Sequence, residues 1–294
     1  MKTPAIKNIT TTPEPHTLAC PLDGLPLTRH NNSWRCPAAH SFDIARQGYV
    51  NLLPVQNKRS RDPGDSKDMV AARQAFLAEG YYQPVAAAVC DAIRRHVSTA
   101  RPIHVLDAGC GEGYYLRQLQ HSALPVFATG VDISKWAVMA AARQQTQAGQ
   151  PTQAAQWIVG SNAHLPLLTA SQDAVLCLFG FPVYSEFARV LKPGAVLVKV
   201  DPGPDHLIEL RKMIYPSIKS AGDTDKHDAE GFTALEHYAV RYTIHVNTPG
   251  MIARLLTMTP HLYRITPDAL ARASALQQIE LSVDVKVSLY RTIF

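Results

Sequence analysis

Long apolar runs are missing from this sequence of 294 residues. The longest candidate, 174–183, is interrupted by Gly180 and Pro182 and is far shorter than the roughly 18 residues that a membrane-spanning helix needs. Residues 1–20 are polar and lack the apolar segment of a secretory signal. Cysteine is also scarce, with five residues and no dense framework. We therefore expect a protein of the reducing cytoplasm without a membrane partner.

Charge of one sign does not dominate, because 29 Lys and Arg stand against 24 Asp and Glu, a net charge of +5. Residues 1–62 hold eight basic and four acidic side chains, so +4 of this charge lies near the N-terminus. The composition, 46% hydrophobic and 18% charged, excludes disordered, collagen-like and coiled-coil classes. A basic end on a nearly neutral body indicates a polyanionic partner, although a solvated surface would give the same small excess.

Four parts follow one another along the chain. We expect a frayed tail over 1–17, a small loop-rich module over 18–55, a basic linker with helices over 56–100, and a large domain over 101–294. The linker holds the turn signal Asp62-Pro63-Gly64, and helices are predicted over 67–79 and 84–96.

Strands alternate with helices in the large domain. The predicted strands lie over 103–107, 125–132, 156–160, 174–179 and 195–201, and the helices over 114–120, 135–147, 184–191 and 204–215. This alternation predicts an α/β fold with a parallel sheet covered on both faces. Two long strands, 237–246 and 281–292, are expected at the end, separated by helices over 250–258 and 267–277.

The most informative segment joins the first of these strands to its helix and reads Val-Leu-Asp107-Ala-Gly109-Cys-Gly111-Glu112-Gly113. Ligands of doubly wound sheets bind beyond the carboxyl ends of the strands, where side chains at Gly109 and Gly111 would fill the space of a nucleoside. The G-x-G-x-G spacing differs from the G-x-G-x-x-G of dinucleotide-binding proteins.

Two further strand ends carry matching chemistry. Asp132 ends the second predicted strand, where its carboxylate can accept hydrogen bonds from both hydroxyls of a ribose. The third strand leads into Ser161 and Asn162, which can present a side chain and a backbone N–H to an adenine edge. The alternative is a set of tight turns with capping acids. Together with the glycine loop, these residues resemble the S-adenosylmethionine site of class I methyltransferases, whose sheet is Rossmann-like.

The segment that would line the acceptor site follows the fourth strand and reads Phe179-Gly-Phe181-Pro-Val-Tyr184. It lacks an Asn/Asp-Pro-Pro-aromatic box, which disfavours transfer to an exocyclic base amine. A Pro-Cys pair is also missing, which disfavours covalent attack on C6 of a pyrimidine. Phe181 and Tyr184 can stack on an extruded base, but they can equally belong to the core.

The N-terminal module contains two short turns with potential metal ligands. The spacing of Cys20, Asp23, Cys36 and His40 suits a four-ligand zinc knuckle. Such knuckles usually have a second cysteine at the position of Asp23, and a carboxylate binds zinc more weakly than a thiolate in structural sites. The alternatives are one structural zinc and a metal-free module held by its small apolar core.

The chain from Cys20 through 41–54 and 58–65 closely resembles the bacterial 23S rRNA guanine-N1 methyltransferases of the RlmA type. The similarity continues through 80–84, 107–115, 202–207 and 258–260, and so covers nearly the whole chain beyond the tail. This resemblance implies a homodimer whose zinc modules shape an RNA cleft. It also implies cofactor contacts from Tyr82, Gly111, Glu112 and His206.

The resemblance implies methyl transfer from S-adenosylmethionine to N1 of a guanine in a 23S rRNA stem-loop. Guanine N1 carries a proton near neutrality, and Asp205 and His206 are the nearest candidate bases by sequence position. His206 can instead contact the cofactor, and Asp205 can cap a helix.

Basic residues of the linker would bind the RNA. We expect phosphate contacts from Lys58, Arg59 and Arg61. Two other functions stay open, namely methylation of a small molecule and noncatalytic RNA binding by a protein that retains a methyltransferase fold.

Overall fold

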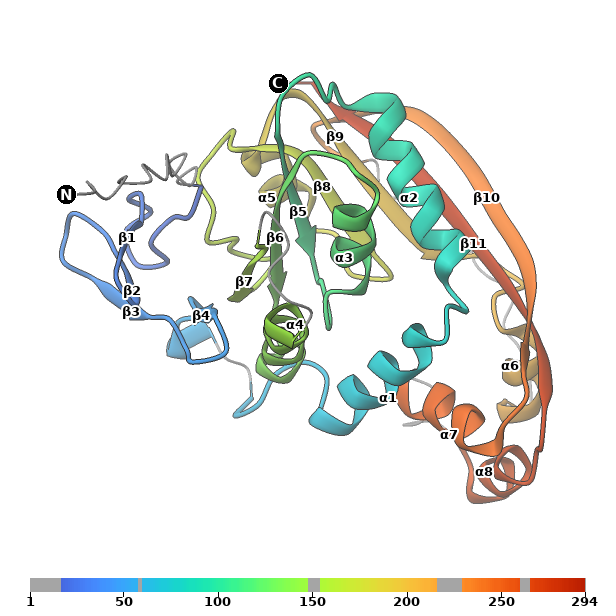
Figure 1. Cartoon of the computed structure of the whole chain (residues 1–294). Helices are drawn as coiled ribbons and strands as arrows, with labels where there is room; N and C mark the ends of the chain where they lie inside the picture. The colour runs from blue at the N-terminus through green and yellow to red at the C-terminus, as the bar shows by residue number, and fades with distance from the viewer. Residues whose placement is uncertain (1–16, 58–59, 148–153, 216–228, 260–264, 294) are drawn as a thin grey trace, which may run out of the picture.

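A mixed sheet forms the centre of the computed structural model, which describes residues 17–57, 60–147, 154–215, 229–259 and 265–293. Its strands are β4 (Tyr49–Asn51), β5 (Ile103–Ala108), β6 (Val126–Asp132), β7 (Gln156–Val159), β8 (Gln172–Leu178), β9 (Leu191–Pro202), β10 (Phe232–Val246) and β11 (Ile279–Thr292). They lie in the order β10-β11-β9-β8-β5-β6-β7-β4 (Figure 1). Strands β4 to β9 pair in parallel, whereas β11 is antiparallel to both β9 and β10.

This order confirms the predicted parallel sheet with an antiparallel pair at its end. The chain moves from β5 through β6 to β7 in one direction, and β8 and β9 are then added on the other side of β5. The order therefore reverses between β5 and β8. Loops at the carboxyl ends of these two strands diverge, and ligands of open α/β sheets bind in the crevice between them.

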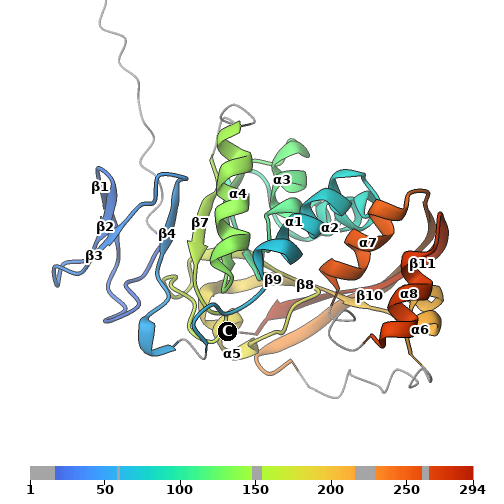
Figure 2. The same cartoon turned by 90° about the horizontal axis from the view of Figure 1, so that it is seen from below.

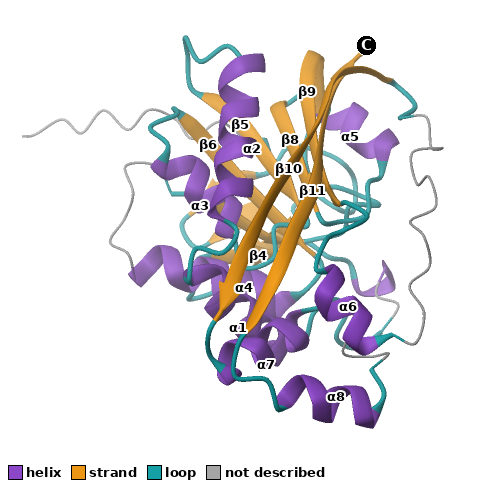
Figure 3. Ribbon diagram, turned by 90° about the vertical axis from the view of Figure 1, so that its right-hand side faces the viewer, coloured by secondary structure: helices purple, strands orange, loops and turns teal. Residues whose placement is uncertain are grey.

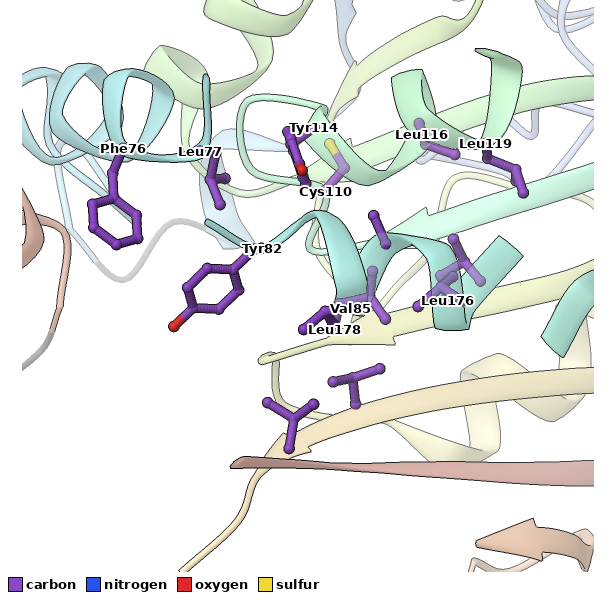
Figure 4. Packing of buried hydrophobic residues seen from close by; sticks show 14 of the residues in the cluster. Phe76, Leu77, Tyr82, Val85, Cys110, Tyr114, Leu116, Leu119, Leu176 and Leu178 are labelled. Atoms are coloured by element: carbon purple, nitrogen blue, oxygen red, sulfur yellow. The ribbon is translucent and has the colours of Figure 1, made fainter. Parts of the chain in front are cut away.

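Helices cover both faces of the sheet. One face carries α2 (Gln83–His96), α3 (Tyr114–His121) and α4 (Lys135–Gln147), and the other carries α5 (Tyr184–Val190). The larger core lies under α2 and α3, where Val85 and Leu116 are fully buried. Figure 4 shows that Tyr82, at the start of α2, stands at one end of this core, beyond Val85 and Leu178. The core thus extends to the carboxyl end of the sheet.

The remaining helices lie near that end of the sheet and along the long hairpin of β10 and β11. They are α1 (Lys67–Ala78), α6 (Ile208–Ile214), α7 (Pro249–Met258) and α8 (Pro267–Ser274), as Figure 3 shows. Helix α1 begins where the Ser66 hydroxyl accepts a hydrogen bond from the Met69 N–H at 3.3 Å. Helix α6 is shorter than the predicted 204–215, because a turn closed by the His206 N–H and the Gly203 carbonyl precedes it.

The N-terminal module is a three-stranded antiparallel sheet of β1 (Thr28–His30), β2 (Ser33–Arg35) and β3 (Ser41–Asp43), followed by β4 and the short 3-10 helix η1 (Val55–Asn57). It packs on the α5 side of the large sheet through a core that includes Leu27 and Trp34. Figure 2 shows the module at the β4 end and the long hairpin at the other.

Strand β4 falls inside the range predicted for the module, 18–55, yet it is the edge strand of the large sheet. The module and the large domain therefore share a strand as well as a linker. Of the predicted tail, residues 1–16 lie outside the described part of the chain. Among the residues that the structure describes, no helix is both long and apolar enough to cross a bilayer.

Candidate active site

A cavity of about 1270 Å³ opens at the carboxyl ends of β5 and β8. Small-molecule sites usually measure roughly 300–1,000 Å³, so this cavity has room for a second reactant beside a nucleoside cofactor. Its wall contains most of the residues that we predicted to bind the cofactor, namely Tyr82, Gly109, Gly111, Glu112, Asp132, Ser161, Asn162 and His206.

The glycine loop leaves one side of this cavity open. A Cβ atom on Gly109 or Gly111 would meet no atom closer than 3.8 Å, so side chains there would project into the open space. Gly113 has a different role, because a Cβ atom there would clash with the Trp157 ring. Gly113 has a φ of 83°, and it allows α3 to begin directly against Trp157.

The Asp132 carboxylate holds this loop in place. Its Oδ2 accepts a hydrogen bond from the Gly111 N–H at 2.9 Å, and its Oδ1 accepts one from the Ser134 N–H at 2.8 Å. Burial raises the pKa of Asp132, while these two N–H groups act in the opposite direction. Each oxygen can accept a further hydrogen bond, so the residue can also receive the hydroxyls of a ribose.

Asp107, at the end of β5, is buried, with 1% of its surface exposed. Neither carboxylate oxygen has a hydrogen-bond partner among the described residues. Burial, reinforced by the nearby Asp132 charge, raises the pKa of Asp107 to about 8. A buried carboxyl group without partners is costly, and a cationic group would satisfy it. The ammonium group of S-adenosylmethionine has the required chemistry, so this site fits that cofactor, although Asp107 itself is not part of the cavity wall.

Arg73 on α1 lies opposite the glycine loop and was not predicted from the sequence. Its Nη1 is 3.8 Å from the position that a Cβ atom would take on Gly111. An ion pair with Asp65 and a 3.1 Å hydrogen bond from Nη2 to the Met258 carbonyl hold the side chain. A guanidinium group beside this loop can bind the carboxylate of the cofactor.

The linker also contributes to the cavity wall, through Pro63, Gly64 and Asp65. Two hydrogen bonds hold it there, one from Trp136 Nε1 to Asp62 Oδ2 and one from Ser134 Oγ to the Asp65 carbonyl, both 2.7 Å. Of the predicted phosphate contacts, Arg61 is exposed beside this segment. Lys58 and Arg59 lie outside the described residues.

One carboxylate oxygen of Glu112 is engaged by neighbouring side chains. Its Oε2 accepts hydrogen bonds from Arg117 at 2.6 Å and from Gln144 at 2.7 Å. The other oxygen, Oε1, has no hydrogen-bond partner within the described segments. A contact between Glu112 and the cofactor can therefore use Oε1 or the backbone.

The loop after β7 places Ser161 and Asn162 on the cavity wall. The Ser161 hydroxyl accepts a hydrogen bond from the Ala163 N–H at 3.2 Å, which forms a small turn. Arg189 on α5 anchors the end of the loop by donating to the Leu165 and Leu167 carbonyls at 2.9 and 2.8 Å. The sequence predicted the two polar residues but not this anchor.

Tyr82 and His206 meet on the β8 side of the cavity. The Tyr82 hydroxyl lies 3.1 Å from His206 Nε2, and the Asp284 N–H donates to His206 Nδ1 at 3.3 Å. Both ring nitrogens are therefore engaged, and the arrangement does not favour His206 as a base. Asp205 is exposed and outside the cavity wall, and its carbonyl accepts a hydrogen bond from the Ile208 N–H at the start of α6. Asp205 therefore lies in the turn that precedes α6.

Asp284 is a second residue that sequence reasoning missed. It is buried in β11, where its carboxylate accepts hydrogen bonds from the Asp205 N–H at 3.1 Å and from Arg241 Nε at 2.9 Å. Gly203 lies so close to this carboxylate that a Cβ atom there would clash with it. Asp284 therefore positions the segment that carries His206. No signal in the sequence marked this residue, because polar side chains alternate with apolar ones along β11.

The predicted metal ligands come together in the N-terminal module. The ligand atoms of Cys20, Asp23, Cys36 and His40 all lie within 4.8 Å of one another. Two thiols, a carboxylate and an imidazole form a donor set that suits tetrahedral zinc. The Leu25 N–H donates to Asp23 Oδ1 and is the main cause that lowers the pKa of Asp23 to about 2, which keeps the carboxylate ionised.

Comparison with known proteins assigns both parts of the chain. Residues 18–61 match the zinc-ribbon family described as "RlmA, N-terminal", and residues 105–194 match the family described as "Methyltransferase domain". The 23S rRNA (guanine(748)-N(1))-methyltransferase of Streptomyces fradiae is 32% identical over 277 residues, which cover 92% of this chain and 95% of that protein.

A Micromonospora griseorubida protein, provisionally named a 23S rRNA (guanine-N(1)-)-methyltransferase, is 33% identical over 300 residues, covering 95% of this chain and 98% of that protein. A Bacillus subtilis protein with the same provisional name is 29% identical and covers 84% of this chain and 86% of its own length. With identity at this level over nearly full lengths, and with the fold and the cavity described above, this chain belongs to the family of 23S rRNA guanine-N1 methyltransferases.

Proposed function

We propose that the protein transfers a methyl group from S-adenosylmethionine to N1 of a guanine in a stem-loop of 23S rRNA. The observation that carries this proposal is the large cavity between β5 and β8, with nucleoside-binding groups on one side and an aromatic loop on the other. A small-molecule methyltransferase would need the same sheet, but it would leave the N-terminal module without a purpose.

The cofactor is held by residues from three strand ends and from α1. Asp132 receives the ribose hydroxyls, and Ser161 with Asn162 meets the adenine edge. Asp107 offsets the charge of the ammonium group from behind the cavity wall, and Arg73 binds the carboxylate. Support for this assignment comes from the orphaned Asp107 carboxylate and from the open space above Gly109 and Gly111.

When bound, S-adenosylmethionine supplies an electrophilic methyl group on a sulfonium ion. The contribution of the protein is to hold the guanine in a near-attack position, an effect that can contribute on the order of 7–11 kcal/mol. Asp205 acts as a turn residue and His206 as a partner of Tyr82, since their surroundings suit those roles better than proton transfer.

The N-terminal module and the linker bind the RNA in this proposal. Exposed basic side chains on this part of the chain include Arg35, Arg46 and Arg61. Because Pro63 to Asp65 form part of the cavity wall, the same segment joins the RNA-binding module to the cofactor site. We further propose that the enzyme works in the cytoplasm as a homodimer, which sedimentation at micromolar concentration would test.

Transfer of labelled methyl groups tests the proposal. The wild-type protein is incubated with labelled S-adenosylmethionine and either unmodified 23S rRNA, assembling large-subunit particles or a pool of small-molecule acceptors. We expect label in the RNA, free or in particles, and a strong loss of incorporation with Asp132→Ala. Label only in the small-molecule fraction would favour a metabolite substrate.

A further inference from the structure

Phe181 is the most exposed large apolar side chain among the described residues, with 92% of its surface accessible. It belongs to the loop 179–183, between β8 and α5, and it lies in the cavity wall. Tyr184, the other aromatic residue of this segment that could stack on a base, is half-buried and packs against Phe232 with ring centroids 6.0 Å apart. Of these two side chains, only Phe181 is exposed on the cavity wall and can meet a ligand.

The position of this loop places Phe181 on the acceptor side of the cavity. A Cβ atom on Gly180 would lie 3.7 Å from the Ala108 carbonyl, so the loop runs beside the residue that precedes Gly109. The nucleoside-binding groups Asp132 and Ser161 follow β6 and β7, on the other side of β5 from β8. A ligand against Phe181 would thus lie beside the glycine loop without occupying the nucleoside site.

The backbone of the loop has an uncommon conformation at Phe179. Phe179 has a φ of 56°, a left-handed conformation that bulky residues rarely adopt. Its N–H donates to the Val200 carbonyl at 2.8 Å, and its ring packs near Tyr82 and His206 with centroids 6.0 and 5.9 Å apart. Pro182 restricts the backbone of Phe181 in turn. Strained segments of this kind gather at ligand-binding sites, because the surrounding structure holds them in one conformation.

We propose that Phe181 stacks on the target guanine after the base leaves its RNA stem, an inference that rests on the proposed function. A base that leaves a duplex loses its stacking, and an exposed aromatic face can replace it. The aromatic ring does not select guanine by hydrogen bonds. Its role is to hold the flat face of the purine so that N1 stays near the methyl donor, which makes Phe181 a substrate-binding residue of the reaction.

Three variants test this role. Phe181→Ala removes the stacking surface, Phe181→Trp keeps it, and Ile293→Ala is the matched control, because Ile293 is also exposed (59%) but lies outside the cavity wall. Loss of one base–aromatic stack should lower kcat/KM for a 23S rRNA stem-loop about tenfold or more. We expect Phe181→Trp and Ile293→Ala to stay close to wild type.

Three further measurements distinguish stacking from other roles. Cofactor affinity by calorimetry should be unchanged in all three variants. The slope of RNA affinity against salt concentration should also be unchanged, because the ring carries no charge. Sedimentation tests whether Phe181 instead packs against a second copy of the chain. A change of oligomeric state in Phe181→Ala would assign the residue to a contact between chains and overturn the proposal.

The outcomes separate this inference from the proposed function. If the wild-type protein forms N1-methylguanosine and Phe181→Ala is as active as Ile293→Ala, the stacking role is wrong while the proposed function stands. If the wild-type protein forms no N1-methylguanosine in free RNA or in particles, the proposed function fails and the stacking role fails with it. A tenfold loss that Phe181→Trp restores would support both.

Discussion

The Tyr82 hydroxyl and His206 Nε2 lie 3.1 Å apart, although the two residues are 124 positions apart in the sequence. The Asp284 N–H donates to His206 Nδ1, so that nitrogen carries no proton. The neutral ring then has its proton on Nε2 and donates it to the Tyr82 oxygen. As a result, the Tyr82 hydroxyl proton is available to donate into the cavity that Tyr82 lines.

The first prediction concerns this hydroxyl. Tyr82→Phe should weaken binding of S-adenosylmethionine about fivefold, the effect of roughly 1 kcal/mol for one hydrogen bond. Tyr81→Phe is the control, because Tyr81 is the neighbouring tyrosine and lies outside the cavity wall. Calorimetry with the purified protein measures both. Equal affinities in the two variants would remove the Tyr82 hydroxyl from the cofactor site.

Asp132 should contribute more strongly, because in the proposed function its carboxylate receives two ribose hydroxyls. We expect Asp132→Ala to weaken binding of S-adenosylmethionine at least tenfold, in line with the roughly 1.5–3 kcal/mol of hydrogen bonds to charged groups. The variant also removes the acceptor of the Gly111 N–H hydrogen bond, so the affinity for adenosine alone should be measured as well. Affinity for adenosine should fall by a similar factor, and an unchanged affinity for both ligands would exclude the ribose role.

Asp107 should make the stability of the cofactor-free protein depend on pH. Its folded-state pKa is about 8, well above the ordinary value of about 3.9. The folded state therefore holds a proton that the unfolded state releases, and its advantage is lost as the pH rises between about 4 and about 8. Asp107→Asn does not titrate, so its thermal midpoint should exceed that of wild type by an amount that grows across this range.

Thermal unfolding at both ends of the range checks this expectation. Asp205→Asn is the control, because Asp205 is an exposed acid with no place in the cavity wall. A constant difference between wild type and Asp107→Asn at the two pH values would contradict the buried, partner-free state of Asp107. In wild type, saturating S-adenosylmethionine should reduce the loss of stability at high pH, because its positive charge would favour the ionised carboxylate.

The metal cluster leads to a prediction about zinc. The protein should bind one zinc ion per chain, and Cys36→Ser should lose it. Asp23→Cys should slow the removal of zinc by a chelator, since a thiolate binds zinc more strongly than a carboxylate in structural sites. Metal analysis by mass spectrometry measures both effects. A wild-type protein without zinc after purification in its presence would show that the module folds on its apolar core alone.

Replacement of Lys58, Arg59 and Arg61 by Ala should weaken RNA binding and make it less dependent on salt. Each phosphate contact that is lost should reduce the slope of log K against log salt by about 0.7 to 0.9. Fluorescence titrations of a stem-loop at several salt concentrations give this slope. The same titration with Lys135→Ala, an exposed lysine on α4, is the control. An unaltered slope in the triple variant would indicate that these residues form a solvated surface and do not contact phosphates.

Local sequence patterns predicted the parts of the site that lie at the end of a single strand. The alternation of apolar strands with helices, together with Asp132 and the glycine loop, was sufficient for the parallel sheet and the cofactor cavity. Arg73 and Asp284 could not be predicted in this way, because each reaches the site from an element distant in sequence. Strand β4 was missed as a strand of the large sheet because three residues show no periodicity.

The most direct test of the account is the identity of the methylated nucleoside. Unmodified 23S rRNA is treated with the protein and S-adenosylmethionine, digested, and analysed by mass spectrometry against nucleoside standards. We predict N1-methylguanosine at a single site. A methylated adenosine, cytidine or uridine, or a guanosine methylated at another atom, would contradict the account even if the cofactor binds tightly.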